Sequence, residues 1–132
     1  MTHRVLLPEG WARPSGYSNG IAARGTQLFV AGQIGWNEGR ELVRDDFVAQ
    51  TRQALLNIVA VLRAGGAGPE HIVRLTWYVT DIAQYRGAGP ALGVAYREVM
   101  GAHYPVMSAV GVTALVEPDA LVEIEATAVV PE

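Results

Sequence analysis

The fold is decided by residues 45–80, which read DDFVAQTRQALLNIVAVLRAGGAGPEHIVRLTWYVT. Apolar and small residues recur there every three or four positions, as on the buried face of an amphipathic helix: Phe47, Thr51, Ala54, Leu55, Ile58, Val61 and Leu62. Asp45 and Asp46 suit the start of this helix, where a cap and the helix dipole favour carboxylates. The polar residues are expected on the opposite side of the helix: Gln50, Arg52, Gln53 and Arg63.

The helix is expected to end at a run of glycines, 65, 66 and 68, followed by Pro69, because these residues tolerate left-handed backbone or cannot extend a helix. Residues 73–80 then alternate apolar with mostly polar side chains and are rich in β-branched and aromatic types, which predicts a half-buried strand. Asp81 is expected to cap a second helical region that Gly87, Gly89 and Pro90 break in its early part.

Strand patterns flank this central unit on both sides. Residues 1–20 are dense in glycine and proline and predict an extended or turning lead-in. Residues 20–24 and 27–32 are separated by Gly25 and Thr26, which predicts a tight hairpin. Two further strands are expected at 106–115 and 121–130. In the last strand one side is apolar, while Glu123, Glu125 and Thr127 share a mixed second side.

The resulting order, β-β-α-β-α-β-β, predicts one α+β domain over residues 1–132, with both helices on one face of a single mixed sheet. The chain has 132 residues, of which 50% are hydrophobic and only 17% charged. A charge fraction below the usual quarter or so suggests that another subunit covers part of the surface. The helix-free face of the sheet is the candidate for that contact.

Composition also excludes several classes of function. The net charge is −3 and the basic residues are scattered, so nucleic acid is not an expected partner. The absence of cysteine removes thiolate nucleophiles and thiolate metal sites. No stretch has the length of a signal peptide core or a membrane span, so we expect a cytoplasmic protein with no membrane partner.

Few residues offer chemistry on spacing alone. The histidines show no metal-ligand spacing, so no metal is expected: His3, His71 and His103. The serines lie outside any Gly-x-Ser-x-Gly elbow: Ser15, Ser18 and Ser108. Glu123 and Glu125 on one strand face could raise the pKa of one carboxyl towards that of a general acid, but a solvated edge pair explains them at least as well. Tyr17 suits a pocket wall and equally suits a residue that pins its loop.

Five segments, in order, resemble the successive signatures of the Rid family, the reactive intermediate deaminases, also called YjgF or liver perchloric-acid-soluble proteins. They are SGYSNG at 15–20, VAGQI at 30–34, QTRQALLNI at 50–58, YPVMS at 104–108 and VEIEATA at 122–128. The resemblance covers nearly the whole chain. It implies a chorismate-mutase-like α+β fold and a homotrimer with pockets at the subunit clefts. Archetypal members hydrolyse enamine and imine intermediates to keto acids and ammonia without a cofactor.

The resemblance also implies site residues. Tyr17 would line the pocket, the backbone at Ala31 and Gly32 would face the substrate, and Glu123 would position or activate water. Ser108 would bind substrate on the segment after Pro105.

One position departs from the archetype. Where the archetypal deaminases carry an arginine that grips the substrate carboxylate, this chain has Met107, which offers no charge. Losing that contact costs about 1.5–3 kcal/mol of binding free energy unless another cation replaces it. A pocket asparagine of the archetype is also replaced, near Gly93.

Three functions follow from this comparison. The first is a cofactor-free enamine or imine hydrolase, an arginine-lacking member whose small-molecule substrate differs from the simple imino acids. The alternative is a non-catalytic trimer that binds a less anionic metabolite in the cleft lined by Met107. The third, an endoribonuclease, has precedent in the family but is disfavoured by the acidic pI and the lack of a histidine pair.

Overall fold

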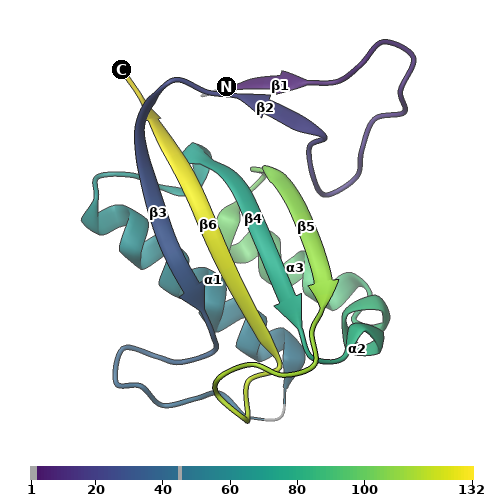
Figure 1. Ribbon diagram of the computed structural model, residues 1–132, viewed down its shortest axis with the longest axis vertical. Coiled ribbons are helices and arrows are strands. Elements are labelled where there is room, and N and C mark those ends of the chain that lie inside the picture. The colour runs from purple at the N-terminus through teal and green to yellow at the C-terminus, as the bar shows by residue number, and fades with distance from the viewer. Residues whose placement is uncertain (1–2, 45) are drawn as a thin grey trace.

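The computed structural model describes residues 3–44 and 46–132 and shows a four-stranded sheet with a layer of helices on one face (Figure 1). The strand order is β3-β6-β4-β5, with β4 and β5 parallel and the other pairs antiparallel. The strands are β3 Gly25–Gln33, β4 Ile72–Val79, β5 Val106–Gly111 and β6 Val122–Pro131. The helices are α1 Phe47–Ala64, α2 Ile82–Gly87 and α3 Pro90–Met100, with a 3-10 turn η1 at Pro69–His71. The predicted α+β fold with a mixed sheet is confirmed.

Helix α1 has the bounds that its sequence predicts. The Asp46 carboxylate accepts a hydrogen bond from the amide of Ala49 at 3.0 Å, which is the expected N-cap. The other predicted cap residue, Asp45, lies outside the described residues. At the C-terminus the amide of Gly65 donates to the carbonyl of Leu62, and Gly66 adopts a φ of 77°, which suits glycine.

The predicted hairpin between residues 20–24 and 27–32 is wrong. Strand β2, Gly20–Ala22, pairs instead with β1, Arg4–Leu6, in a separate two-stranded sheet, so the lead-in contains a strand. Strand β3 pairs with β6. Gly25 is not a turn residue: it begins β3 at a φ of 145°, and a Cβ there would lie 1.9 Å from the carbonyl oxygen of Val130. Close backbone packing, rather than a hairpin turn, explains this glycine.

The two faces of the main sheet differ as the alternation in β6 predicts. Residues of β4 and β6 that point to the helices are buried with the apolar face of α1, including Leu75, Val79, Val122, Ile124, Leu55 and Ile58. Glu123, Glu125 and Thr127 alternate with them on the helix-free face and stay partly exposed. On the same face Phe29 is 73% exposed. Across the described chain, none of the helices combines the length and apolar character that crossing a membrane requires.

Gln50 contradicts the expectation that it faces solvent. Its side chain is completely buried on the core side of α1. Its Nε2 donates to the carbonyl of Asp119 at 3.1 Å, and its Oε1 accepts from the amide of Leu121 at 2.7 Å. The Gln50 side chain therefore satisfies backbone groups in the loop before β6, as a neighbouring strand would. Helical periodicity in the sequence cannot reveal such a contact. This contact fixes the loop at residues 112–121.

A bulge interrupts β3 where it approaches the end of the sheet. The pairing with β6 shifts between Val30 and Gln33, so Ala31 and Gly32 lie in the irregular part. A Cβ at position 32 would lie 2.6 Å from Glu123 Oε1 and 2.7 Å from its Cδ. A Cβ at this point would therefore have to displace the Glu123 side chain, which packs directly over the backbone.

We predict that Gln50→Leu lowers the free energy of unfolding by about 2–3 kcal/mol, because the Asp119 carbonyl and the Leu121 amide lose their partner. Urea denaturation measures the change. The matched variant Gln84→Leu alters an exposed side chain on α2 and should change stability by less than about 0.5 kcal/mol. Equal effects of the two variants would show that the Gln50 contacts contribute nothing.

We also predict that Gly32→Ala destabilises the fold by about 1–2 kcal/mol through its overlap with Glu123. In a Glu123→Ala background most of this cost should vanish, because the overlapping carboxylate is gone. A double-mutant cycle followed by urea denaturation measures the coupling. Gly87→Ala is the control, since a Cβ there meets nothing within 4 Å. A cost at position 32 that persists without Glu123 would contradict the packing described.

Candidate functional site

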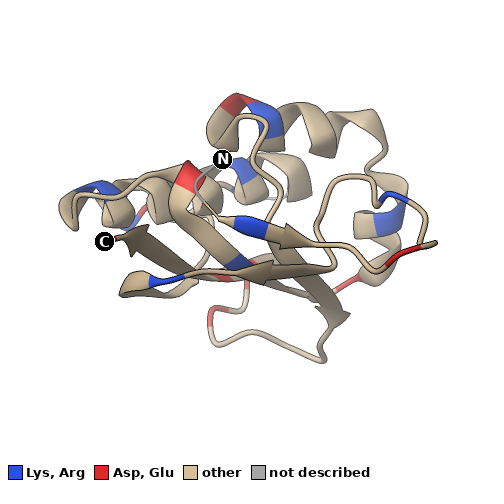
Figure 2. Ribbon diagram, turned by 90° about the horizontal axis from the view of Figure 1, so that it is seen from above, with Lys and Arg blue, Asp and Glu red and all other residues tan. Residues whose placement is uncertain are grey.

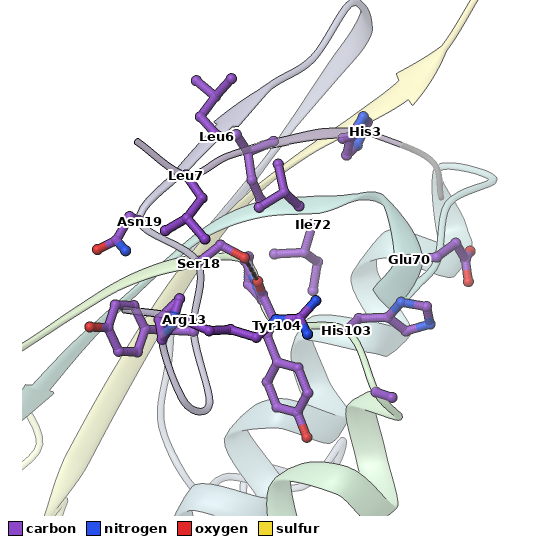
Figure 3. Close-up of a pocket in the computed structure, with 16 residues that line it drawn as sticks. His3, Leu6, Leu7, Arg13, Ser18, Asn19, Glu70, Ile72, His103 and Tyr104 are labelled. Carbon is purple, nitrogen blue, oxygen red and sulfur yellow. Dashed lines mark hydrogen bonds between the residues drawn. The ribbon is translucent and has the colours of Figure 1, made fainter. Parts of the chain in front are cut away.

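Two hollows lie near opposite ends of the main sheet. The Glu123 hollow, of about 310 Å³, lies at the β3 edge and is lined by Gly32, Trp36, Leu115, Val116, Glu117 and Glu123, among others. The Tyr17 cavity, of about 670 Å³, is lined by the lead-in, the start of β4 and the segment before β5, including Leu6, Arg13, Tyr17, Ile72, His103 and Tyr104 (Figure 3). The Glu123 hollow lies at the end of β3 and the start of β6, and the Tyr17 cavity lies beside the starts of β4 and β5. Because β6 runs antiparallel to β4, these are opposite ends of the sheet, so the two hollows of one chain are separate.

The two neighbouring carboxylates of β6 have different surroundings. The Tyr78 hydroxyl donates to Glu125 Oε1 at 2.5 Å. This hydrogen bond, followed by desolvation and by the charges of Glu125 and Glu123, raises the pKa of Tyr78. Within residues 3–44 and 46–132, the Glu123 carboxylate makes no hydrogen bond or ion pair and faces its hollow. Glu125 is therefore held by the Tyr78 hydroxyl, whereas the oxygens of Glu123 face the hollow.

The rim of the Glu123 hollow is fixed by a polar residue of α1 that the sequence analysis did not single out for a role. Asn57 Nδ2 donates to the carbonyl of Trp36 at 2.6 Å and to that of Ile34 at 3.2 Å. The Arg40 guanidinium lies 5.9 Å from the centre of the Trp36 ring, in cation–π range. Asn57 shares its helix face with Gln53, whose Nε2 donates to Asn57 Oδ1 at 2.9 Å, and this pair of amides four residues apart is the sequence signal that could have revealed it.

Ala31 and Gly32 lie at the bulge, where Gly32 is packed beside Glu123. Gln33 Nε2 donates to the Ala31 carbonyl at 3.2 Å, which steadies the exposed backbone there. Gly32 lines the hollow directly.

Tyr17 lies in the other hollow, 42% exposed, on a loop that the next residue anchors. The buried Ser18 donates its amide to the carbonyl of Pro105 at 3.1 Å and its hydroxyl to the carbonyl of Tyr104 at 2.5 Å. These bonds join the lead-in to the segment before β5. Because Ser18 pins the loop, Tyr17 remains available to line the cavity.

Met107 and Ser108 lie on opposite faces of β5. Met107 pairs in register with the buried Leu75 and packs against the core on the helix side. Ser108 pairs with Thr76, so it lies exposed on the helix-free face. Neither residue lines the two hollows described, and Gly93, within α3, lines neither. Their roles in substrate binding stay predictions.

Comparison with known proteins identifies the group to which this architecture belongs. The family model described as endoribonuclease L-PSP matches residues 11–130. A RutC family protein of Pyrococcus horikoshii is 37% identical over 126 residues, which are 94% of this chain and 95% of that protein. A protein of Dermatophagoides farinae named 2-iminobutanoate/2-iminopropanoate deaminase is 30% identical over 115 residues, 86% of this chain and 85% of that one.

A solved structure agrees over almost the full length. The crystal structure of the Rid family protein YyfB from Yersinia pestis, described as of unknown function, superposes with a TM-score of 0.85. It shares 39% identity and covers 98% of this chain and 100% of its own. The match spans the sheet, the helices and both hollows, so the chain belongs to the Rid family, the group also known as YjgF, L-PSP or RutC proteins.

Proposed function

We propose that this protein is a cofactor-free enamine/imine hydrolase whose active site forms between subunits of a homotrimer. The observation that supports this most is Glu123. Of two adjacent carboxylates, Glu125 is occupied by Tyr78, and Glu123 is left facing a hollow beside a bulged strand. A positioned carboxylate without an internal partner is suited to general acid–base chemistry.

The reaction needs one base that becomes an acid. Glu123 accepts a proton from water while the water oxygen bonds to the imine carbon, and the Glu123 carboxyl passes that proton to the imine nitrogen, which gives a neutral carbinolamine. The Glu123 carboxylate then accepts the proton of the carbinolamine hydroxyl and delivers it to the amine nitrogen. The carbon–nitrogen bond breaks as the carbon–oxygen double bond forms, and ammonia leaves. One imine and one water thus give one ketone and one ammonia, with Glu123 returned to its carboxylate.

The separation of the two hollows supports the subunit arrangement. One surface carries Glu123 at the β3 edge, and a different surface carries Tyr17 near the start of β5. A head-to-tail contact places different surfaces of two copies against each other and closes into a ring when the rotation permits. The exposed Phe29 and Val110 on the helix-free face, at 73% and 44%, offer apolar area for such a contact.

The surface charge gives no comparable support to a ribonuclease. The ten basic residues are all arginine, and they are spread over several elements of the described chain rather than gathered in one patch (Figure 2). Binding to a polyanion such as RNA depends on clustered positive charge. The proposal therefore takes a small molecule as the substrate.

We expect Glu123→Gln to slow ammonia release from freshly generated imines by about a hundredfold or more, as loss of a general acid–base does. Imines produced in place by an amino acid oxidase serve as substrates, with ammonia measured over time. Glu125→Gln makes the same chemical change two residues away and should reduce the rate much less. Equal rates for wild type and Glu123→Gln would contradict the role of Glu123, and rates no faster than the uncatalysed reaction would favour the alternative, a trimer that binds a metabolite without turnover.

Subunit sharing predicts complementation. Tyr17→Ala and Glu123→Gln chains are each expected to be strongly impaired. If chains assemble at random from an equal mixture, about a quarter of the shared sites receive an intact half from each side. Co-refolding followed by ammonia measurement should therefore recover about a quarter of wild-type activity, with light scattering reporting the trimer mass. No recovery in a mixture that forms trimers would place both residues in a site within one subunit.

A further inference from the structure

The Tyr17 cavity is lined by one arginine, Arg13, two histidines, His3 and His103, and one acidic side chain, Glu70. With histidine counted as neutral, as it is in the net charge of −3 for the whole chain, the charges of Arg13 and Glu70 balance. Whether the cavity favours an anionic occupant therefore depends on which of these groups already have a partner, because a guanidinium without one favours an anion.

Arg13 is the group best placed to bind that anion. In Figure 3 its side chain extends from the lead-in into the cavity, towards the side where Tyr104 and His103 lie. Among the described residues it makes no hydrogen bond or ion pair. His3 differs, because its Nε2 already contacts the carbonyl of His71 at 3.2 Å. The Arg13 guanidinium thus keeps its full set of donors for a ligand.

The loop that presents Arg13 is held in place before any ligand binds. The amide of Trp11 donates to the carbonyl of Pro8 at 3.1 Å on one side, and Ser18 is anchored to residues 104 and 105 on the other. Pro14 restricts the backbone of Arg13 to extended conformations. This preorganisation lowers the entropy that binding must overcome.

The opposite side of the cavity is held with equal firmness. The Tyr96 hydroxyl donates to the carbonyl of His103 at 2.5 Å, and the rings of Tyr96 and Tyr104 stack with centroids 5.6 Å apart. These contacts fix the backbone of His103 without using its imidazole. Arg13 and His103 therefore approach the cavity from two anchored segments, which the hydrogen bonds of Ser18 join to each other.

The rest of the wall is apolar. Leu6, Leu7 and Ile72 lie above Arg13 and His103 in the view of Figure 3. A volume of about 670 Å³ falls within the range of small-molecule sites. A ligand that fills it needs a hydrocarbon body against the leucines and a negative charge against Arg13.

We propose that Arg13, assisted by His103, binds the carboxylate of a small molecule with an apolar body in the Tyr17 cavity. The cavity belongs to the active site proposed above, so the identity of the bound molecule as a substrate rests on the proposed function. Binding of the carboxylate does not depend on turnover. Arg13 supplies a positive charge from the lead-in, in a cavity that the neutral Met107 of β5 does not line. The expected substrate is thus an imine or enamine of a carboxylic acid with a branched or aromatic side chain.

Calorimetric titration with α-ketoisocaproate, a stable branched keto acid, tests the proposal. The carboxylate should bind at least about tenfold more tightly than its neutral amide, and Arg13→Gln should weaken its binding about tenfold, as for an exposed charge-assisted contact. Arg13→Lys should recover only part of this affinity, because the ammonium lacks the planar fork. His103→Gln should give a smaller loss.

Two further variants control for charge. Arg24→Gln removes the same charge from an exposed position outside the cavity and should leave binding unchanged. Glu70→Gln removes the opposing charge in the cavity and should tighten binding about two- to threefold. Equal affinity for the acid and its amide, or equal losses for Arg13→Gln and Arg24→Gln, would overturn the proposal. Inorganic phosphate binding as tightly as the keto acid would overturn the apolar part.

The same variants separate this inference from the proposed function. If binding of the keto acid depends on Arg13 but the protein releases no ammonia from imines, the carboxylate site is supported and the proposed hydrolase activity is wrong. If imine hydrolysis depends on Glu123 but its KM is unchanged in Arg13→Gln, the hydrolase activity is supported and the carboxylate site is wrong.

Discussion

The double pairing of β6 is the constraint on which the rest of the structure depends. This strand hydrogen bonds to β3 on one side and to β4 on the other, in the middle of the sheet. Its side chains alternate, with Val122, Ile124 and Ala126 buried against the helices and Glu123 and Glu125 on the free face. A slip of one residue would exchange the two sets. The free energy of core burial therefore also fixes where the carboxylates point.

Side-chain hydrogen bonds to backbone carbonyls and amides hold the loops that this sheet leaves unpaired. Gln50 holds the loop before β6, Asn57 holds the rim at Trp36, and Ser18 holds the Tyr17 loop. Each satisfies backbone groups that have no strand partner nearby, which a buried loop cannot leave unpaired. As a result, both hollows are lined by loops that side chains hold in place, although the sequence of these regions is rich in glycine.

The sequence predicts what local periodicity determines. Helix α1, strand β4 and the alternation in β6 follow from patterns of a few residues, and the Asp46 cap follows from residue type. The hairpin prediction failed because the partner of β2 lies in the lead-in and that of β3 lies in the distant β6. Gln50 was placed in solvent because helical periodicity cannot show a hydrogen bond to residue 119.

The candidate site was predictable only in part for the same reason. Glu123 and Gly32 meet because β3 and β6 pair, and the resemblance already grouped them. Arg13 and His103 line the same cavity because the fold brings the lead-in next to the segment before β5. No spacing rule connects residues so far apart in the chain, so the positive side of the cavity emerges only from the tertiary structure.

The central place of β6 also has a consequence for synthesis in the cell. While the ribosome still holds this strand, β3 and β4 have emerged with their pairing edges open and their apolar sides uncovered. Such nascent chains combine unsatisfied strand edges with exposed hydrophobic surface, the two features that promote aggregation. Release of β6 closes both of these edges in one step.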